Sequence, residues 1–125
     1  MPILTVKGMP TQTPQLELLL FRLADAAAGI KELALTRNQV SVFFPLDMVR
    51  EGIGEELIAF VDGLFKKPER TPEVLKRLAE SIRDVLADFA QRHVPQCRLI
   101  EVLVHSFDPT VEGFASREIG KQQTS

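Results

Sequence analysis

Hydrophobic positions in the first third of the chain predict a strand, a helix and a second strand. Ile3 to Val6 is aliphatic and β-branched and is followed by Gly8, which is typical of a short strand ending in a turn. Thr13-Pro14 indicates a helix cap with proline at the first helical position, and leucines at helical spacing continue towards a stop at Gly29. Val40 to Phe44 then predicts a mostly buried strand.

The second half of the chain repeats this order of elements with a longer helix. Leu57 to Phe65 is an apolar run that predicts a third strand. Thr71-Pro72 repeats the cap signal, and apolar residues at helical spacing lead to a break at 93–95. Leu99 to Val104 predicts a fourth strand. Between the two halves, Pro45 to Glu56 carries charges and glycines, and we expect a mobile connection there.

The two halves can be superposed by sliding the sequence about 58 positions, which indicates an internal repeat. The matched positions are Pro14 with Pro72, Leu20 with Leu78, Ile3 to Val6 with Val61 to Leu64, and Val40 to Phe44 with Arg98 to Val102. Four matches in the same order are harder to attribute to chance than one.

The predicted fold class is α+β, with two repeated β-α-β units that form a four-stranded sheet carrying both helices on one face. A helix that joins two neighbouring parallel strands crosses over right-handedly in nearly all proteins. The same element order also fits a ferredoxin-like arrangement, in which the strands of each half are not neighbours. A sheet covered on one face only leaves its other face and its edges in need of partners, so we expect self-association.

Charge and composition exclude several classes of partner. The net charge is −2 and the pI is about 5.7, so the chain has no excess of Lys and Arg with which to bind nucleic acid or an anionic membrane. No apolar stretch approaches the roughly 18 residues needed to span a bilayer. Cys97 is the single cysteine and cannot form an internal disulfide, and we expect no secretion signal, because the first residues lack a basic flank and a long apolar run. We therefore expect a cytoplasmic protein.

Other groups of polar residues do not predict a metal or cofactor site. His93, Cys97 and His105 lack a fourth ligand and a compact metal-binding spacing. Residues 52–54 (Gly-Ile-Gly) lack the third glycine and the strand-turn-helix setting of a dinucleotide site. Residues 66, 67 and 70 (Lys, Lys and Arg) are interpreted as a solvated cluster of loop charges. We expect neither a metal nor a cofactor.

Several of these segments together resemble the tautomerase superfamily, which includes 4-oxalocrotonate tautomerase (4-OT), 5-carboxymethyl-2-hydroxymuconate isomerase and macrophage migration inhibitory factor. The segments are Met1-Pro2-Ile3-Leu4, the helix after Thr13, Val40 to Phe44 before Pro45, Ala59-Phe60-Val61 running towards Lys66, Val104 to Asp108, and Gly113-Phe114. The likeness covers residues 1 to about 116. It implies one domain over 1–116, with units at about 1–45 and 57–105, a polar tail at 117–125, and a homotrimer.

Pro2 is the candidate catalytic residue. Removal of Met1 would leave its secondary amine at the chain terminus, and an α-amino group that titrates near 7.7 to 8.0 is a usable base at neutral pH. The resemblance implies that this amine moves a proton between carbon atoms, or between an enol oxygen and carbon, without a cofactor. Retention of Met1 would instead make Pro2 an amide without basicity. Proline at position 2 also occurs in many proteins simply because it permits removal of methionine.

The resemblance implies further substrate-binding residues around Pro2. They are Arg37 as the first candidate cation, Lys31 as a weaker one, His105 as a polar pocket residue, and Phe114 and Phe65 as aromatic ones. Ser41 stands where 4-OT carries an arginine on the second strand, so the substrate of that enzyme is not expected here. The chain has no Tyr and no Trp, so an enolate must be stabilised by Arg, His, Lys or backbone amides.

The leading hypothesis is a cofactor-independent tautomerase or isomerase acting on a small carbonyl or enol acid, such as a 2-oxo acid. Dehalogenases and decarboxylases of the same superfamily also use the N-terminal proline. The alternative from another class is a non-catalytic oligomeric module, either tautomerase-like or a ferredoxin-like ligand-binding domain.

Overall fold

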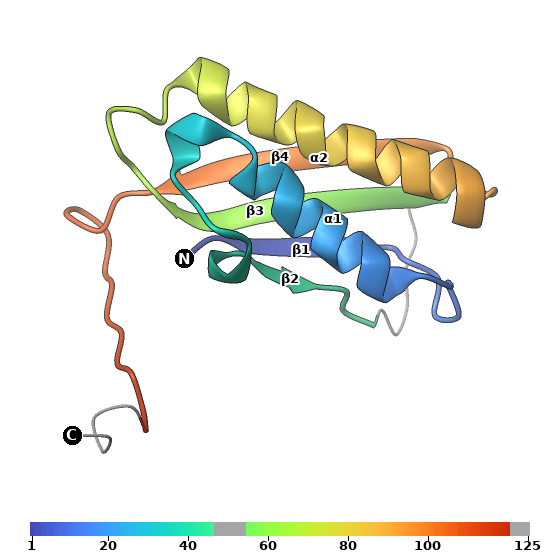
Figure 1. Cartoon of the computed structure of the whole chain (residues 1–125), viewed down its shortest axis with the longest axis horizontal. Coiled ribbons are helices and arrows are strands. Elements are labelled where there is room, and N and C mark those ends of the chain that lie inside the picture. The colour runs from blue at the N-terminus through green and yellow to red at the C-terminus, as the bar shows by residue number, and fades with distance from the viewer. Residues whose placement is uncertain (47–54, 121–125) are drawn as a thin grey trace.

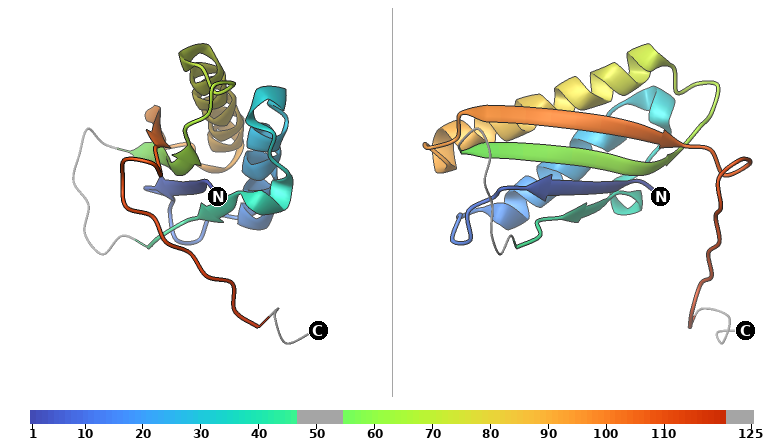
Figure 2. Two further views of the ribbon diagram at one scale, coloured as in Figure 1. Left: turned by 90° about the vertical axis from the view of Figure 1, so that its left-hand side faces the viewer. Right: turned by 180° about the vertical axis from the view of Figure 1, so that it is seen from behind.

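The computed structural model describes residues 1–46 and 55–120 of the chain, which form one four-stranded sheet and two α-helices (Figure 1). The elements in chain order are β1 (Ile3–Lys7), α1 (Leu16–Ala28), the 3₁₀ helices η1 (Lys31–Leu33) and η2 (Arg37–Gln39), β2 (Ser41–Phe43), β3 (Glu56–Phe65), α2 (Pro72–His93) and β4 (Leu99–Phe107). Both helices cover the same face of the sheet, and no helix of the described residues lies on the other face (Figure 2). The predicted fold class is confirmed.

The strand order decides between the two arrangements that the sequence left open. The sheet runs β2-β1-β3-β4, with β1 parallel to β2 and β3 parallel to β4. The strands of each half are therefore neighbours, which excludes the ferredoxin-like order. The two units meet through β1 and β3, which pair in antiparallel orientation.

The two helices begin differently, although both follow a Thr-Pro pair. Thr71 caps α2 as predicted, because its hydroxyl accepts a hydrogen bond from the Val74 N–H at 3.3 Å. The prediction that Thr13 caps α1 is wrong. The Thr13 hydroxyl donates to the Pro10 carbonyl at 2.7 Å within a turn, and α1 begins three residues later, after Gln15. The hydroxyl that would cap the helix is already used in the turn.

Other boundaries also differ from the sequence prediction. Two short 3₁₀ helices, η1 and η2, occupy the segment between α1 and β2, where no element was predicted. β2 is only three residues long, whereas β4 continues to Phe107 and so includes His105. Of the predicted connection Pro45 to Glu56, residues 47–54 lie outside the described part of the chain, as does the end of the tail, residues 121–125.

The core lies between the helices and the sheet. Alternate residues of β1, such as Leu4 and Val6, are buried beneath the helices, together with Leu19 and Leu23 of α1 and Leu78 of α2. No charged or polar residue of the described segments belongs to this core. Neither helix in these segments is long and apolar enough to cross a membrane.

The opposite face of the sheet, which we call the open face, is accessible and carries large apolar side chains among polar ones. Its exposed side chains include Ile3 of β1, Phe43 of β2 and Leu103 of β4, which are 42%, 54% and 51% exposed. Ile58 and Phe60 of β3 are half-buried on the same face. Contiguous exposed apolar residues of this kind mark an interaction surface.

A bulge at Gly63 interrupts the pairing of β3 with β4. Val61 pairs with Val104 and Leu64 with Ser106, so β3 has one residue more than β4 over this interval. Gly63 adopts a φ of +72°, which glycine reaches without the steric cost that other residues incur. The extra residue changes the alternation, and Leu64 consequently points into the core, where it is fully buried.

We expect Gly63→Ala to lower the free energy of unfolding by about 1–2 kcal/mol, because alanine is strained at positive φ. Gly113→Ala is the matched control, since a Cβ added there meets no atom within 4 Å. Urea unfolding of both variants at equal protein concentration measures the difference. Equal midpoints would show that the bulge does not need glycine.

Candidate functional site

A pocket of about 160 Å³ lies at the start of β1, beside the end of β3 and the segment that contains η1 and η2. Its lining consists of Met1, Pro2, Ala34, Leu35, Gln39, Gly63, Phe65, Lys67 and Arg70. It contains two cations and no carboxylate. The structure therefore brings the predicted residues Pro2 and Phe65 together in one cavity.

Pro2 is held in this pocket by the sheet. Its side chain is buried, and its carbonyl accepts a hydrogen bond from the Ser41 N–H of β2 at 3.1 Å. Met1 precedes it, is 67% exposed and also lines the pocket. The Met1 carbonyl lies so close to Gly63 that a Cβ there would be 3.2 Å from it. Glycine at the bulge therefore leaves room for the start of the chain.

Arg70 is a half-buried cation with an unused donor at this site. Its Nη1 donates to the Phe65 carbonyl at 2.6 Å and its Nη2 to the Leu33 carbonyl at 2.8 Å. Its Nε is buried and has no hydrogen-bond partner among the described residues. Burial lowers the pKa of Arg70 from its usual value, and the charge of Glu69 acts in the opposite direction. The guanidinium still remains protonated at physiological pH, because its ordinary pKa is so high.

The interpretation of Arg70 as part of a solvated loop cluster is therefore wrong. The loop turns tightly after β3: the Lys66 N–H donates to Phe107 of β4 and the Arg70 N–H to Lys67, at 2.8 and 3.0 Å. Because β3 is antiparallel to β1, this loop lies beside the start of the chain. Lys67 and Arg70 were not predicted as site residues, because the local pattern of the sequence does not reveal this strand pairing. The feature of the sequence that could have identified them is their position just after the predicted third strand.

Aromatic residues form a cluster at one side of the pocket. Phe65, which lines the pocket, stacks on Phe107 of β4 with ring centroids 5.9 Å apart. Phe114 of the C-terminal segment meets the Phe65 ring edge-on at 4.9 Å. Phe114 does not itself line the pocket, and 55% of its surface is exposed. A role of Phe114 in substrate binding would therefore be indirect, through its contact with Phe65, and it stays a prediction.

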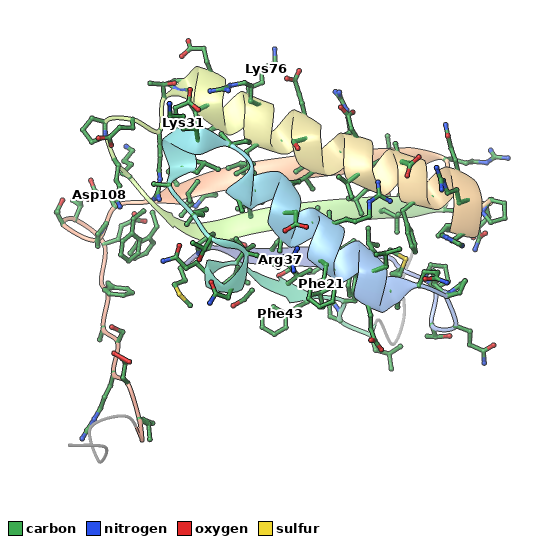
Figure 3. The ribbon with its side chains drawn as sticks, in the orientation of Figure 1. Phe21, Lys31, Arg37, Phe43, Lys76 and Asp108 are labelled. Atoms are coloured by element: carbon green, nitrogen blue, oxygen red, sulfur yellow. The ribbon has the colours of Figure 1, made fainter. Side chains whose placement is uncertain are left out.

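Arg37 lies outside this pocket. Its Nε and Nη2 donate to the two carboxylate oxygens of Asp25 on α1 at 2.6 and 2.9 Å, and its guanidinium lies 5.2 Å from the Phe21 ring (Figure 3). The hydrogen bond from Arg37 holds the pKa of Asp25 below its usual value, and Asp25 in turn raises the pKa of Arg37. The structure thus does not bring Arg37 to Pro2 within one chain. Its substrate-binding role stays a prediction.

Lys31 and His105 also do not line the Pro2 pocket. Lys31 borders an adjoining hollow of about 570 Å³, which shares Ala34 and Lys67 with the pocket. His105 is exposed on β4, and the alternation with the half-buried Val104 places it on the open face of the sheet. Within residues 1–46 and 55–120, no group of three His, Cys, Asp or Glu side chains is placed to hold a metal ion.

The lining of the pocket favours a small anion. Lys67 and Arg70 provide two positive charges, and Leu35 and Phe65 provide an apolar wall. A cation fixed in a partly buried site attracts a carboxylate more strongly than it would in bulk water. Pro2 directly follows Met1, so removal of this one residue would turn the Pro2 nitrogen from an amide into an amine that can act as a base.

No protein-family model matches the sequence, and no curated protein matches it. Solved structures do match, at low sequence identity. A fused 4-OT wild-type symmetric trimer has a TM-score of 0.62 at 18% identity, covering 90% of this chain and 91% of that chain. FG41 malonate semialdehyde decarboxylase inhibited by 3-bromopropiolate has a TM-score of 0.60 at 16% identity, and the match covers 93% of this chain and 91% of that chain. Macrophage migration inhibitory factor from Toxoplasma gondii has a TM-score of 0.55 at 15% identity, covering 92% and 97%.

These matches extend over nearly the whole of both chains in each comparison, so they concern the entire fold and not one shared motif. They agree with the arrangement of two β-α-β units in one four-stranded sheet. Because the sequence identities are below 20%, these matches establish the fold and do not establish the chemistry, which depends on the residues of this chain. The chain has the fold of the tautomerase superfamily.

Proposed function

We propose that the protein is a cofactor-independent tautomerase or isomerase of a small 2-oxo or enol acid, with the amine of Pro2 as the acid-base group after removal of Met1. The observation that carries this proposal is the pocket in which Pro2 lies with Lys67 and Arg70 and without a carboxylate. A base and a positive charge in one cavity are the two requirements for removing a proton next to a carbonyl.

The proposed division of roles follows from the contacts. Arg70 is fixed by two backbone carbonyls, and the second N–H of each Nη is a donor that remains for a substrate carboxylate or enolate oxygen. Lys67 supplies a second, more mobile charge. Two neighbouring cations also disfavour a third positive charge on the Pro2 amine, which keeps that amine available as a base. Phe65 would contact the apolar part of the substrate.

We also propose that the chain works as a homotrimer in the cytoplasm. The open face of the sheet exposes Ile3, Phe43 and Leu103, and burying such a face against other copies is favourable by about 25 cal/mol per Å². The similar fused 4-OT structure is a trimer. Neither Arg37 nor His105 lines the Pro2 pocket of its own chain. In such an assembly we expect them to contribute to the Pro2 pocket of another copy.

Pro2→Ala is expected to reduce the ketonisation of phenylenolpyruvate about 100-fold, because a positioned acid-base group contributes roughly that factor or more. Intact mass and N-terminal sequencing first establish that Met1 is absent from both proteins, so that each presents an amine at the same place. Similar rates for Pro2→Ala and the unchanged protein would show that Pro2 is not the base. Retention of Met1 on the native protein would exclude the catalytic role altogether.

Lys67→Ala is expected to raise KM for an anionic substrate about tenfold with a smaller change in kcat, because a charge-assisted contact of this kind is worth about a factor of ten. Arg77→Ala is the control, since this exposed arginine pairs with Glu32 and does not line the pocket. Arg70→Lys tests the other cation, and we expect it to lower kcat, because the single ammonium nitrogen cannot reproduce the planar fork with which the guanidinium holds two carbonyls and faces the pocket.

A KM for Lys67→Ala equal to that of Arg77→Ala would contradict an anion site at this position. Arg37→Ala is measured in parallel, with thermal unfolding recorded to account for loss of the Asp25 pair. A rise in its KM without loss of stability would show that Arg37 completes the pocket of another copy.

Leu103→Glu is expected to convert the trimer to a monomer in light scattering at micromolar concentration, because it replaces an exposed apolar side chain of the proposed interface with a charge. Leu18→Glu is the control: Leu18 is 55% exposed on α1, on the helical side of the sheet. A monomer for the unchanged protein, or dissociation of both variants alike, would contradict an interface on the open face.

A further inference from the structure

A second cavity lies at the other end of the molecule, between the end of α2 and the start of β4. Its volume is about 550 Å³, which falls within the range of small-molecule sites. Its lining includes Arg83, Gln91, Cys97 and Arg98, with apolar surface from Ala87, Ala90, Val94, Pro95, Leu99 and Ile100. Like the Pro2 pocket, it contains two cations and no carboxylate.

The walls of this cavity are fixed by backbone hydrogen bonds. The Val94 N–H donates to Ala90 at the last turn of α2 at 2.9 Å, and the Cys97 N–H donates to Val94 at 3.0 Å. The Arg98 N–H donates to the Glu55 carbonyl at 2.7 Å, which ties the start of β4 to the segment before β3. The cavity is therefore formed before any ligand arrives, so little ordering cost opposes binding.

The charges of the cavity favour an anion. Nε and Nη2 of Arg83 both donate to a single oxygen of Asp84, at 3.0 and 2.9 Å, which leaves Nη1 for a ligand. The Arg98 guanidinium makes no ion pair with any residue in the described part of the chain. The carbonyl end of α2 carries partial negative charge, but this effect fades within one turn and is smaller than the full charge of Arg98, to which Arg83 adds the part of its charge that Asp84 does not balance.

We propose that this cavity binds a small organic carboxylate with an apolar body, whose carboxylate lies between Arg83 and Arg98 and whose body lies against Val94 and Ile100. Arginine binds carboxylates through paired hydrogen bonds, and Gln91 adds a neutral donor at the rim. The apolar lining around these polar groups is typical of a small-molecule site and not of a site for an inorganic ion. The proposal does not depend on the activity proposed for Pro2.

The new site is separate from the Pro2 pocket. β4 runs from the new site, at Leu99, to the aromatic cluster beside the Pro2 pocket, at Phe107, and its nine residues span about 26 Å. The two pockets share no lining residue. In Figure 1 the end of α2 and the start of β4 lie at the right, and the N-terminus lies at the left. Occupation of one site therefore does not block the other sterically.

The single cysteine of the chain offers a local measurement. Cys97 is half-buried in the lining of the cavity, and its thiol lies 3.6 Å from the Leu99 carbonyl. Alkylation by iodoacetamide, followed by intact mass, therefore reports on this site alone. We expect 2-naphthoate to slow this alkylation in a saturable manner, and the uncharged 2-naphthamide to require about tenfold higher concentration.

Three variants assign the effect to the arginines. Arg98→Gln and Arg83→Gln are each expected to raise the half-protecting concentration of 2-naphthoate about tenfold. Arg92→Gln is the matched control, because Arg92 is an exposed arginine of the same helix end that pairs with Asp88 and does not line the cavity. Equal protection by naphthoate and naphthamide, or no change in either cavity variant, would overturn the proposal.

An NMR titration makes the test independent of thiol reactivity. With 2-naphthoate we expect amide shifts centred on residues 94–100 that saturate at the same concentration as the protection. Shifts confined to residues around Pro2, or none at all, would overturn the proposal even if Cys97 proved unreactive.

Discussion

Five residue pairs hold β1 antiparallel to β3, from Ile3 opposite Asp62 to Lys7 opposite Ile58. Each of these strands carries its own parallel partner and its own helix, so this ladder joins the two units into one sheet. It also fixes what lies beside the start of the chain. Because the strands run in opposite directions, the end of β3 and the loop with Lys67 and Arg70 lie next to Pro2.

The ladder also explains why one face of the sheet is covered and the other is open. Both crossovers place their helices on the same side, and the alternation of side chains sends Leu4 and Val6 into the core and Ile3 outwards. The bulge at Gly63 preserves this division near the pocket, where the pairing with β4 would otherwise turn Leu64 away from the core. A single glycine thus serves both the packing of β3 and the space around the N-terminus.

The sequence predicted what depends on local pattern and missed what depends on pairing between distant segments. Helical spacing, the Thr71 cap and the repeat were sufficient for the order of elements and for the fold class. The prediction that Thr13 caps α1 was wrong because its hydroxyl has a nearer acceptor in the preceding turn. Arg70 was interpreted as a solvent charge, and the contact of Arg37 with Asp25 was not predicted, since both positions follow from contacts with residues far away in sequence. Pro2 and Phe65 were found because each lies at the end of a predictable strand.

The burial of Pro2 affects the stage at which Met1 can be removed. An aminopeptidase must reach the bond between Met1 and Pro2, yet in the folded chain Pro2 is buried, its carbonyl is bonded to Ser41, and the Met1 carbonyl lies against Gly63. Cleavage is therefore easiest while the N-terminus is still unpaired, before β1 joins the sheet. β3 and its loop are synthesised long after Met1 emerges from the ribosome, so the N-terminus stays unpaired during translation and the bond is accessible in that period. A chain that still carries Met1 and refolds rapidly would make this bond inaccessible to the aminopeptidase.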